Sequence, residues 1–200
     1  MDYRNFAGKM GSKDYLKYAL LSLMEEKSIY KVTVKELCDK AMINRSTFYD
    51  NYSNLDDFFE HVMRELAEGL VKVMESMGPP EDMLADKDLA TRMYTKWYQY
   101  VEDHYDEFRL FMGANGTPVF REMLNVQGLA RYTRMLKPII SRHENDVSLD
   151  ILVNYIVGAH MGLLEYYVNS GMKYSAGYMA EQMVGITVSG PYSVINLYRD

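Results

Sequence analysis

Residues 33–58 read TVKELCDKAMINRSTFYDNYSNLDDF, and this stretch decides the fold. Thr33 is followed three residues later by Glu36, a capping box that predicts a short helix of about two turns. Asn44 is a second good N-cap residue, and it opens another short helix that carries Phe48 and extends to Tyr52. The stretch therefore predicts two short helices joined by a tight turn.

The sequence on either side of this stretch predicts two longer amphipathic helices. Apolar residues recur every four positions over residues 15–24. Asn54, followed by two aspartates that complement a helix dipole, begins an apolar stripe that continues to Met77. The Gly-Pro-Pro at 78–80 ends it. Two short helices between two longer ones are typical of a helix-turn-helix bundle.

The remaining sequence also has helical apolar spacing, without strand-like alternation or repeats. We expect further helices over residues 89–105, 108–112, 119–127, 129–141 and 148–170, and from Ser175 onward. The fold class is therefore all-α, with about nine helices. The expected organisation is a domain over 1–54, a connecting fourth helix over 55–77 and a second domain over 78–200.

The composition is that of a globular protein, and the distribution of charge indicates which part of it could contact nucleic acid. The 200 residues are 48% hydrophobic and 25% charged, with a net charge of −6. Residues 1–54 carry nine Lys/Arg against seven Asp/Glu, and the rest carry thirteen against twenty-one. Residues 1–54 are therefore mildly basic and the rest of the chain is acidic. This distribution is expected if only residues 1–54 contact nucleic acid. One cysteine, no signal-peptide pattern and no long uncharged apolar run favour a cytoplasmic protein without a membrane span.

Eighteen Tyr and sixteen Met are the most informative part of the composition. Methionine is adaptable and tyrosine joins an apolar ring to a polar tip, so together they suit a cavity for an organic ligand. A loosely specified helical core with surface tyrosines is the alternative. We expect no cofactor and no metal.

The second short helix has few large apolar residues. Phe48 anchors it inward, and its remaining side chains project outward. Arginine can fork onto guanine, threonine can contact a base edge, and tyrosine and asparagine can donate to phosphate. Insertion into a DNA major groove accounts for so short and polar a helix, and a solvated surface helix is the alternative.

Residues 33–58 resemble the DNA-binding signature of TetR-type (TetR/AcrR) transcriptional regulators. The resemblance lies in Thr33, the Thr47-Phe48-Tyr49 triplet, Tyr52 and the polar turn that leads to Phe58. The tail is similar to the regulatory domain of a Gram-positive branch of that family, from Phe108-Arg-Leu-Phe through Gly158-Ala-His-Met-Gly-Leu to Met172-Lys-Tyr-Ser.

The resemblance implies a dimer that binds a palindromic operator in double-stranded DNA. It implies phosphate contacts by Thr33, Lys35, Tyr49, Asn51 and Tyr52, and base contacts by Arg45, Ser46 and Thr47. Asn44, at the start of the second short helix, is the ninth residue expected to contact DNA.

Three residues depart from the family pattern, and each bears on DNA affinity. Met42 stands where glycine is usual, so its turn must avoid positive φ or bear strain. Leu55 stands where a phosphate-binding lysine is common, and Asp50 adds a negative charge to the recognition helix. Lys9 and Lys13 could compensate from an N-terminal arm.

The resemblance further implies a regulatory half that binds an effector and dimerises through its last two long helices. Residues expected at the dimer interface are Leu149, Val153, Ile156, Gly158, Gly162, Met179, Met183 and Ile186. Burial within the monomer is the alternative for these residues. A two-fold dimer would place its recognition helices about one turn of DNA, roughly 34 Å, apart.

Aromatic density in the second half predicts a pocket for a mostly apolar organic effector. The residues expected to line it are Tyr94, Trp97, Tyr98, His104, Phe108, Phe111, Met112, Phe120, Met123, Tyr132, Tyr155 and His160. Ordinary core packing is the alternative for each of them.

Two other classes of protein are alternatives to a ligand-controlled regulator. An enzyme is disfavoured because the four histidines, at 61, 104, 143 and 160, lack metal-ligand spacing and the chain has no phosphate loop or nucleophile elbow. A co-activator that docks a protein partner instead of a small ligand stays open. Repression is the commoner family outcome, and no residue excludes activation.

Overall fold

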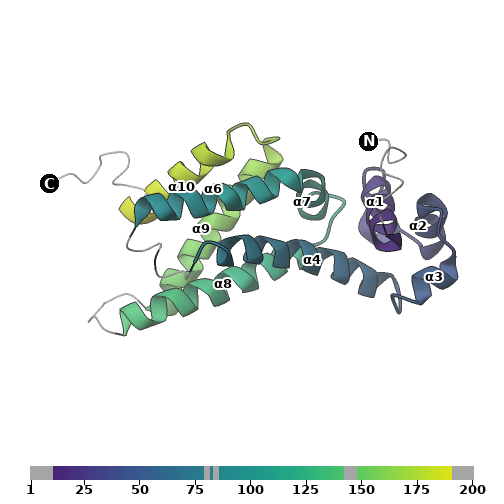
Figure 1. Ribbon diagram of the computed structural model, residues 1–200, viewed down its shortest axis with the longest axis horizontal. Coiled ribbons are helices and arrows are strands. Elements are labelled where there is room, and N and C mark those ends of the chain that lie inside the picture. Colours follow the sequence, from purple (N-terminus) through teal and green to yellow (C-terminus); the bar gives the residue numbers. More distant parts are fainter. Residues whose placement is uncertain (1–10, 79–81, 83–85, 142–147, 191–200) are drawn as a thin grey trace. The chain divides into compact units, whose positions relative to one another are not determined.

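The computed structural model describes residues 11–78, 82, 86–141 and 148–190, and this part of the chain is helical and without strands (Figure 1). The all-α prediction is therefore confirmed. The elements are α1 (Ser12–Met24), the 3-10 turn η2 (Ile29–Lys31), α2 (Val34–Ala41), α3 (Arg45–Tyr49), α4 (Leu55–Glu75), α6 (Lys87–Asp103), α7 (Tyr105–Met112), α8 (Pro118–Ile140), α9 (Leu149–Asn169) and α10 (Ala176–Ser189).

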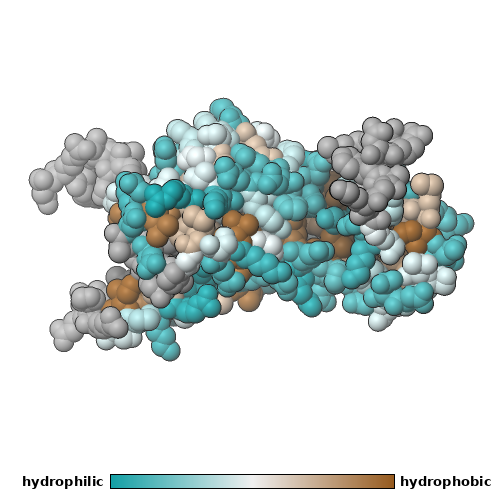
Figure 2. All heavy atoms as spheres, in the orientation of Figure 1, coloured by the Kyte–Doolittle hydropathy of each residue, from teal (hydrophilic) through white to brown (hydrophobic). Residues whose placement is uncertain are grey.

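The helices fall into two compact units. The N-terminal unit comprises residues up to Leu66 together with 106–120, and the C-terminal unit comprises 67–105 and the residues from Arg121 onward. The helix α4 begins in the first unit and ends in the second. Most of the face shown in Figure 2 is hydrophilic, as expected when the apolar stripes pack inside.

The core of the N-terminal unit is built from α1 and a cluster of aromatic rings. Leu16, Leu20 and Met24 of α1 are almost fully buried. The ring of Phe48 lies 5.6 Å from that of Tyr52 and 5.9 Å from that of Phe58. The cluster thus joins α3 to the first turns of α4.

Residues 106–120, distant in sequence, are fastened to the end of α1 and to η2. The side chain of Asn115 donates to the Met24 carbonyl at 2.8 Å, and its own carbonyl accepts from the Ile29 amide at 2.9 Å. The hydroxyls of Tyr30 and Thr117 lie 2.6 Å apart, and Arg109 pairs with Glu25. These bonds explain why this segment folds with the N-terminal unit.

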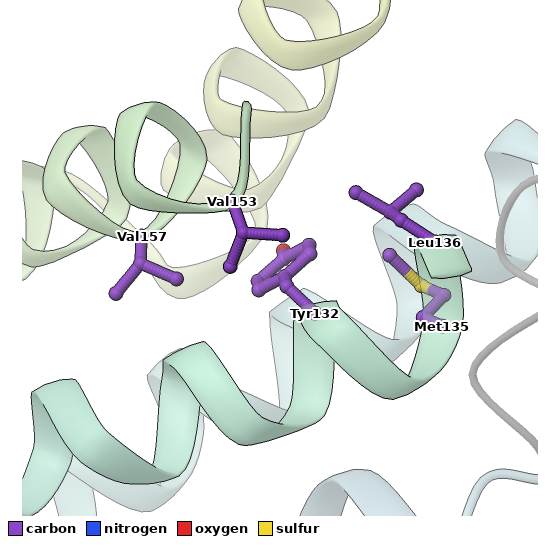
Figure 3. Packing of buried hydrophobic residues seen from close by; sticks show 5 residues of the cluster. All are labelled: Tyr132, Met135, Leu136, Val153 and Val157. Atoms are coloured by element: carbon purple, nitrogen blue, oxygen red, sulfur yellow. The ribbon is translucent and has the colours of Figure 1, made fainter. Parts of the chain in front are cut away.

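The C-terminal unit packs α8 against α9 and α6 against α10. Figure 3 shows the ring of Tyr132 directed from α8 toward Val153 and Val157 on α9. The sequence predicted separate helices over 119–127 and 129–141, and this prediction was wrong. The helix α8 runs unbroken from Pro118 to Ile140. Gly128 lies inside it and is a contact point for α9, since a Cβ there would lie 3.1 Å from Val157 Cγ1.

Candidate functional site

The helix α2 starts with the predicted capping box. The Glu36 amide donates to the Thr33 hydroxyl at 3.2 Å, and the Thr33 amide donates to the Glu36 carboxylate at 3.1 Å. Hydrogen bonds from Lys27 and Thr33 lower the pKa of Glu36 to about 2. The cap therefore stays ionised across physiological pH and fixes the start of the helix.

The turn between α2 and α3 has a positive φ at Met42, which is the second of the two alternatives that the sequence left open. Met42 adopts the left-handed conformation, with φ 54° and ψ 40°, and its side chain is 87% exposed. A side chain at positive φ is disfavoured, and this one contributes little packing in return.

Replacing Met42 by glycine is expected to raise the free energy of unfolding by about 0.5–1 kcal/mol, because glycine adopts positive φ without strain. Urea denaturation of the full chain would measure the change. As a control, Lys40→Gly, at an exposed helical position of α2, is expected to lower it by a similar amount. A Met42→Gly protein that is less stable than the parent would contradict the strain.

The short helix α3 presents polar side chains over one buried anchor. Phe48 is fully buried, whereas Arg45, Ser46 and Tyr49 are exposed and Thr47 is half-buried. Four further residues at the start of α2 and on either side of α3 are also exposed: Thr33, Lys35, Asn44 and Asn51. The helix α3, its two flanking asparagines and the start of α2 thus place eight of the nine residues expected to contact DNA at the surface of the N-terminal unit.

Tyr52 is the exception among those residues. It is 4% exposed, its ring belongs to the aromatic cluster, and its hydroxyl has no hydrogen-bond partner among the described residues. The structure therefore places it in the core and not at a surface where phosphate could reach it.

Other polar residues near α3 have defined local roles. The Asn51 side chain donates to the Thr47 carbonyl at 2.8 Å, while that of Asn44 makes no capping bond. Asn54 caps α4 by accepting from the Asp57 amide at 2.9 Å. Asp50 and Lys13 are exposed, and Lys9 lies outside the described residues.

The C-terminal unit contains a cavity of about 80 Å³. A buried water needs about 10–15 Å³ on this measure, so the space can hold several heavy atoms of a ligand. Of the residues expected to line a pocket, four do so: Tyr94, Trp97, Tyr132 and His160. Its further walls come from Leu70, Val71, Met74, Leu124, Gln127, Gly128, Arg131, Val157, Met161, Leu164 and Met183.

The other eight expected pocket residues lie elsewhere. Phe108, Phe111, Met112 and Phe120 belong to the N-terminal unit, where the ring of Phe120 packs 5.6 Å from Phe108 and 5.5 Å from Phe111. Tyr98 is buried, and its hydroxyl donates to the sulfur of Met183. His104 ends α6, Met123 is half-buried on α8, and Tyr155 is 59% exposed on α9.

A chain of hydrogen bonds runs along the cavity wall. The Tyr94 hydroxyl bonds to that of Tyr132, which lies 2.9 Å from His160 Nδ1. His160 Nε2 lies 3.1 Å from the Thr187 hydroxyl on α10. Desolvation lowers the pKa of His160 to about 4 and raises the pKa of both tyrosines. The four groups, which we call the relay, are therefore uncharged at neutral pH.

One face of α9 is apolar yet exposed. Ile151 and Tyr155 are 65% and 59% exposed, and a Cβ at Gly158 or Gly162 would meet nothing within 4 Å. By length and composition alone α9 could cross a membrane, a property that core helices share. Of the other residues expected at a dimer interface, Val153, Met179 and Met183 are buried within the chain, and Leu149, Ile156 and Ile186 are half-buried.

Comparison with known proteins finds sequence similarity to transcriptional regulators. A family model of the TetR type, described as a transcriptional regulator C-terminal region, matches residues 88–188. The uncharacterized HTH-type transcriptional regulator YxbF of Bacillus subtilis is 34% identical over 59 residues, which are 30% of this chain. The match spans only 16% of the length of that relative.

Two solved structures share the fold at low identity. The regulator FadR from Bacillus subtilis, in complex with stearoyl-CoA, has a TM-score of 0.63 at 15% identity, over 88% of this chain and 98% of that one. A putative TetR-family regulator from Syntrophomonas wolfei has a TM-score of 0.67 at 13% identity, over 94% and 96% of the two chains. Since the family model covers half of the sequence, the chain belongs to the TetR-type transcriptional regulators.

Proposed function

We propose that this regulator is a cytoplasmic, dimeric repressor that binds a two-fold symmetric DNA operator and is released by a small, mostly apolar organic effector. The observation that carries the proposal is the course of α4. Its first turns pack Phe58 against Phe48, the anchor of α3, and its later turns supply Leu70, Val71 and Met74 to the cavity wall. One helix therefore serves both the DNA-binding head and the cavity.

The exposed residues of α3 and the start of α2 suit a major groove. Arg45 is expected to fork onto guanine, with Asn44, Ser46 and Thr47 close to base edges. Thr33, Lys35, Tyr49 and Asn51 are expected to hold backbone phosphates, which fix register without reading sequence.

Release follows from a shift between two conformations of the dimer. DNA requires one separation of the two heads, and an effector releases DNA only if it binds better to a conformation with another separation. Filling the cavity would displace the Leu70, Val71 and Met74 side chains of α4, the helix whose first turns also pack Phe58 against Phe48. The chain thus acts by binding and not by catalysis.

A second copy of the chain is the occupant that we propose for the exposed face of α9. Gly158 and Gly162 lie four residues apart, so a partner helix can approach closely between Tyr155 and Tyr166, which are 59% and 48% exposed. Burying this face would remove apolar surface from water, and a two-fold axis would pair the two DNA-binding heads.

Substituting Gly158 by glutamate is expected to convert the dimer to monomers without unfolding the chain. The new side chain has open space in the monomer but would place a charge in the interface. Sedimentation velocity would measure the oligomeric state. Ala130→Glu, at an exposed position of α8, is the matched control and should stay dimeric. A dimeric Gly158→Glu protein would assign the interface to another face.

Replacing Arg45 by alanine is expected to weaken binding to the selected operator about 5- to 150-fold, the loss of one bidentate base contact worth about 1–3 kcal/mol. The operator would come from selection on random duplex DNA at a fixed salt concentration. Arg64→Ala, an exposed arginine paired with Glu60 on α4, is the control and should bind nearly as the parent does. If no symmetric site is enriched, or if both variants bind alike, the recognition role of α3 is wrong.

A protein partner in place of the small effector is the second candidate. The stacked rings of Tyr174 and Tyr178, 4.9 Å apart, with Tyr166 close by, favour it because tyrosine is enriched at protein interfaces. Release of operator DNA by a small compound alone would count against this candidate.

A further inference from the structure

The cavity of the C-terminal unit has an apolar wall and a neutral polar strip. Most of its lining is Leu, Val, Met and Trp, and none of the lining residues is an aspartate or glutamate. A cation would therefore lose its hydration without gaining a counter-charge. Arg131 also belongs to the lining, but it already interacts with other groups of the chain.

The relay forms the polar strip, and three of its members line the cavity: Tyr94, Tyr132 and His160. They come from α6, α8 and α9, and Thr187 on α10 ends the chain of bonds. A neutral imidazole has one donor and one acceptor nitrogen, so the hydrogens of the relay can be arranged in only two ordered ways.

In the first arrangement His160 Nε2 carries the hydrogen and donates to Thr187. Nδ1 then accepts from Tyr132, and the Tyr132 oxygen accepts from Tyr94. The oxygen of Tyr94, at the end of the relay, is left with lone pairs only, and it can accept one hydrogen bond from a ligand.

In the second arrangement Nδ1 carries the hydrogen and donates to the Tyr132 oxygen, while Thr187 donates to Nε2. Tyr132 then donates to Tyr94, whose own hydrogen is free for a ligand. The relay thus offers the cavity either one donor or one acceptor, and no net charge in either arrangement.

We propose that the effectors of this regulator are uncharged, mostly apolar molecules with a single hydroxyl or carbonyl oxygen, and that the relay binds that oxygen through Tyr94. This inference rests on the proposed effector role of the cavity. A hydroxyl that donates is matched by the first arrangement, and a carbonyl that accepts is matched by the second. A carboxylate would be desolvated against apolar walls and would find no positive charge on the relay, and Arg131, the cationic residue of the described lining, already interacts with other groups of the chain.

The test uses six-carbon probes on the full chain at pH 7: 1-hexanol, 2-hexanone, hexanoate and hexylammonium. Trp97, the single tryptophan of the sequence, lines the cavity, so its fluorescence reports occupancy without a label. The alcohol and the ketone are expected to bind, and both ions to bind at least about 10-fold more weakly. Hexanoate or hexylammonium as the tightest probe, or no binding by any of the four, would overturn the proposal.

Two variants assign the contact to the relay. Tyr94→Phe removes only the terminal hydroxyl, and it is expected to weaken 1-hexanol and 2-hexanone about 3- to 10-fold, the loss of one neutral hydrogen bond. Tyr167→Phe is the matched control, because it removes a hydrogen-bonded hydroxyl that donates to Glu102 and belongs to a residue outside the cavity lining. Unchanged affinity in Tyr94→Phe, or equal losses in both variants, would contradict the assignment.

Operator binding, followed by fluorescence anisotropy with the same probes, separates this inference from the proposed function. Binding of 1-hexanol without DNA release would support the ligand class and contradict effector control. DNA release by hexanoate alone would support effector control and overturn the ligand class.

Discussion

Replacing Gly116 by alanine is expected to lower the free energy of unfolding of the N-terminal unit by about 3 kcal/mol. A Cβ at this position would lie under 3.0 Å from the carbonyl oxygens of Phe111 and Leu110. These are backbone atoms, so the clash cannot be relieved by turning a side chain. The turn between α7 and α8 would have to open, and the bond from the Thr117 amide to the Phe111 carbonyl, 3.2 Å, would be lost.

The damage would spread to α1 because the same turn carries Asn115 and Thr117, which bond to Met24 and Tyr30. Thermal and urea unfolding of the full chain would measure the change. Gly177→Ala is the matched control: its Cβ would meet nothing within 4 Å inside α10, so stability should stay the same or rise slightly. If the two variants unfold alike, residues 106–120 do not support the N-terminal unit.

Local signals in the sequence predicted the helix-turn-helix well. The box of Thr33 and Glu36 and the cap of Asn54 depend on residues only three apart, and both form as expected. At Met42 the absence of glycine left two alternatives, a turn that avoids positive φ or a strained one, and the structure has the positive φ. Short-range hydrogen bonds and single-residue φ preferences are encoded within a few positions, so a sequence pattern suffices to find them.

Signals that depend on distant packing were harder to interpret. Gly128 resembled a break between two helices, whereas its small size admits Val157 against α8. The rings of Phe108, Phe111 and Phe120 resembled a ligand pocket, but they form part of the core of the N-terminal unit. Aromatic density indicates burial for most of these residues, although Tyr155 is exposed, and it does not show against which neighbours they pack.

The cavity was only partly predicted for the same reason. Tyr94, Trp97, Tyr132 and His160 were expected there, while the α4 wall was missed because its apolar stripe looks like any amphipathic helix. Some residues of this stripe belong to the core of the N-terminal unit and others line the cavity. Which of them line the cavity depends on α6, α8 and α9. No spacing within α4 encodes it.

Acidification from pH 8 to pH 5 is expected to lower the free energy of unfolding through His160 by about 2 kcal/mol. In the unfolded chain the imidazole has its ordinary pKa of 6.5, whereas burial lowers the pKa in the folded protein to about 4. Between these values the unfolded state binds more protons than the folded state does. Stability is therefore complete above about pH 6.5 and is lost as the pH falls toward 4.

Among the described residues that line the cavity around His160, none is a carboxylate. No carboxylate of the lining would therefore raise the pKa of His160 and reverse the direction of the change in stability with pH. Tyr94 on α6, Tyr132 on α8 and Thr187 on α10 are its polar neighbours, and the pKa of both tyrosines is raised, so none of them titrates in this window. Protonated His160 could no longer accept from Tyr132 or Thr187. Both nitrogens would then donate, which breaks the order of the relay and places a charge in an apolar wall.

His160→Gln isolates this contribution, since an amide keeps a neutral donor and acceptor but does not titrate between pH 5 and 8. The measurement is urea unfolding of both proteins at pH 8, 6.5 and 5. The quantity to compare is the change of the free energy of unfolding with pH, and not its absolute value. The parent should lose about 2 kcal/mol more than the variant over this range. Parallel slopes would mean that His160 accepts a proton in the folded protein, and the relay could then carry a charge into the cavity. In that case the same residue would favour anionic effectors at low pH, and the preference of the cavity for uncharged ligands would be confined to neutral and alkaline solution.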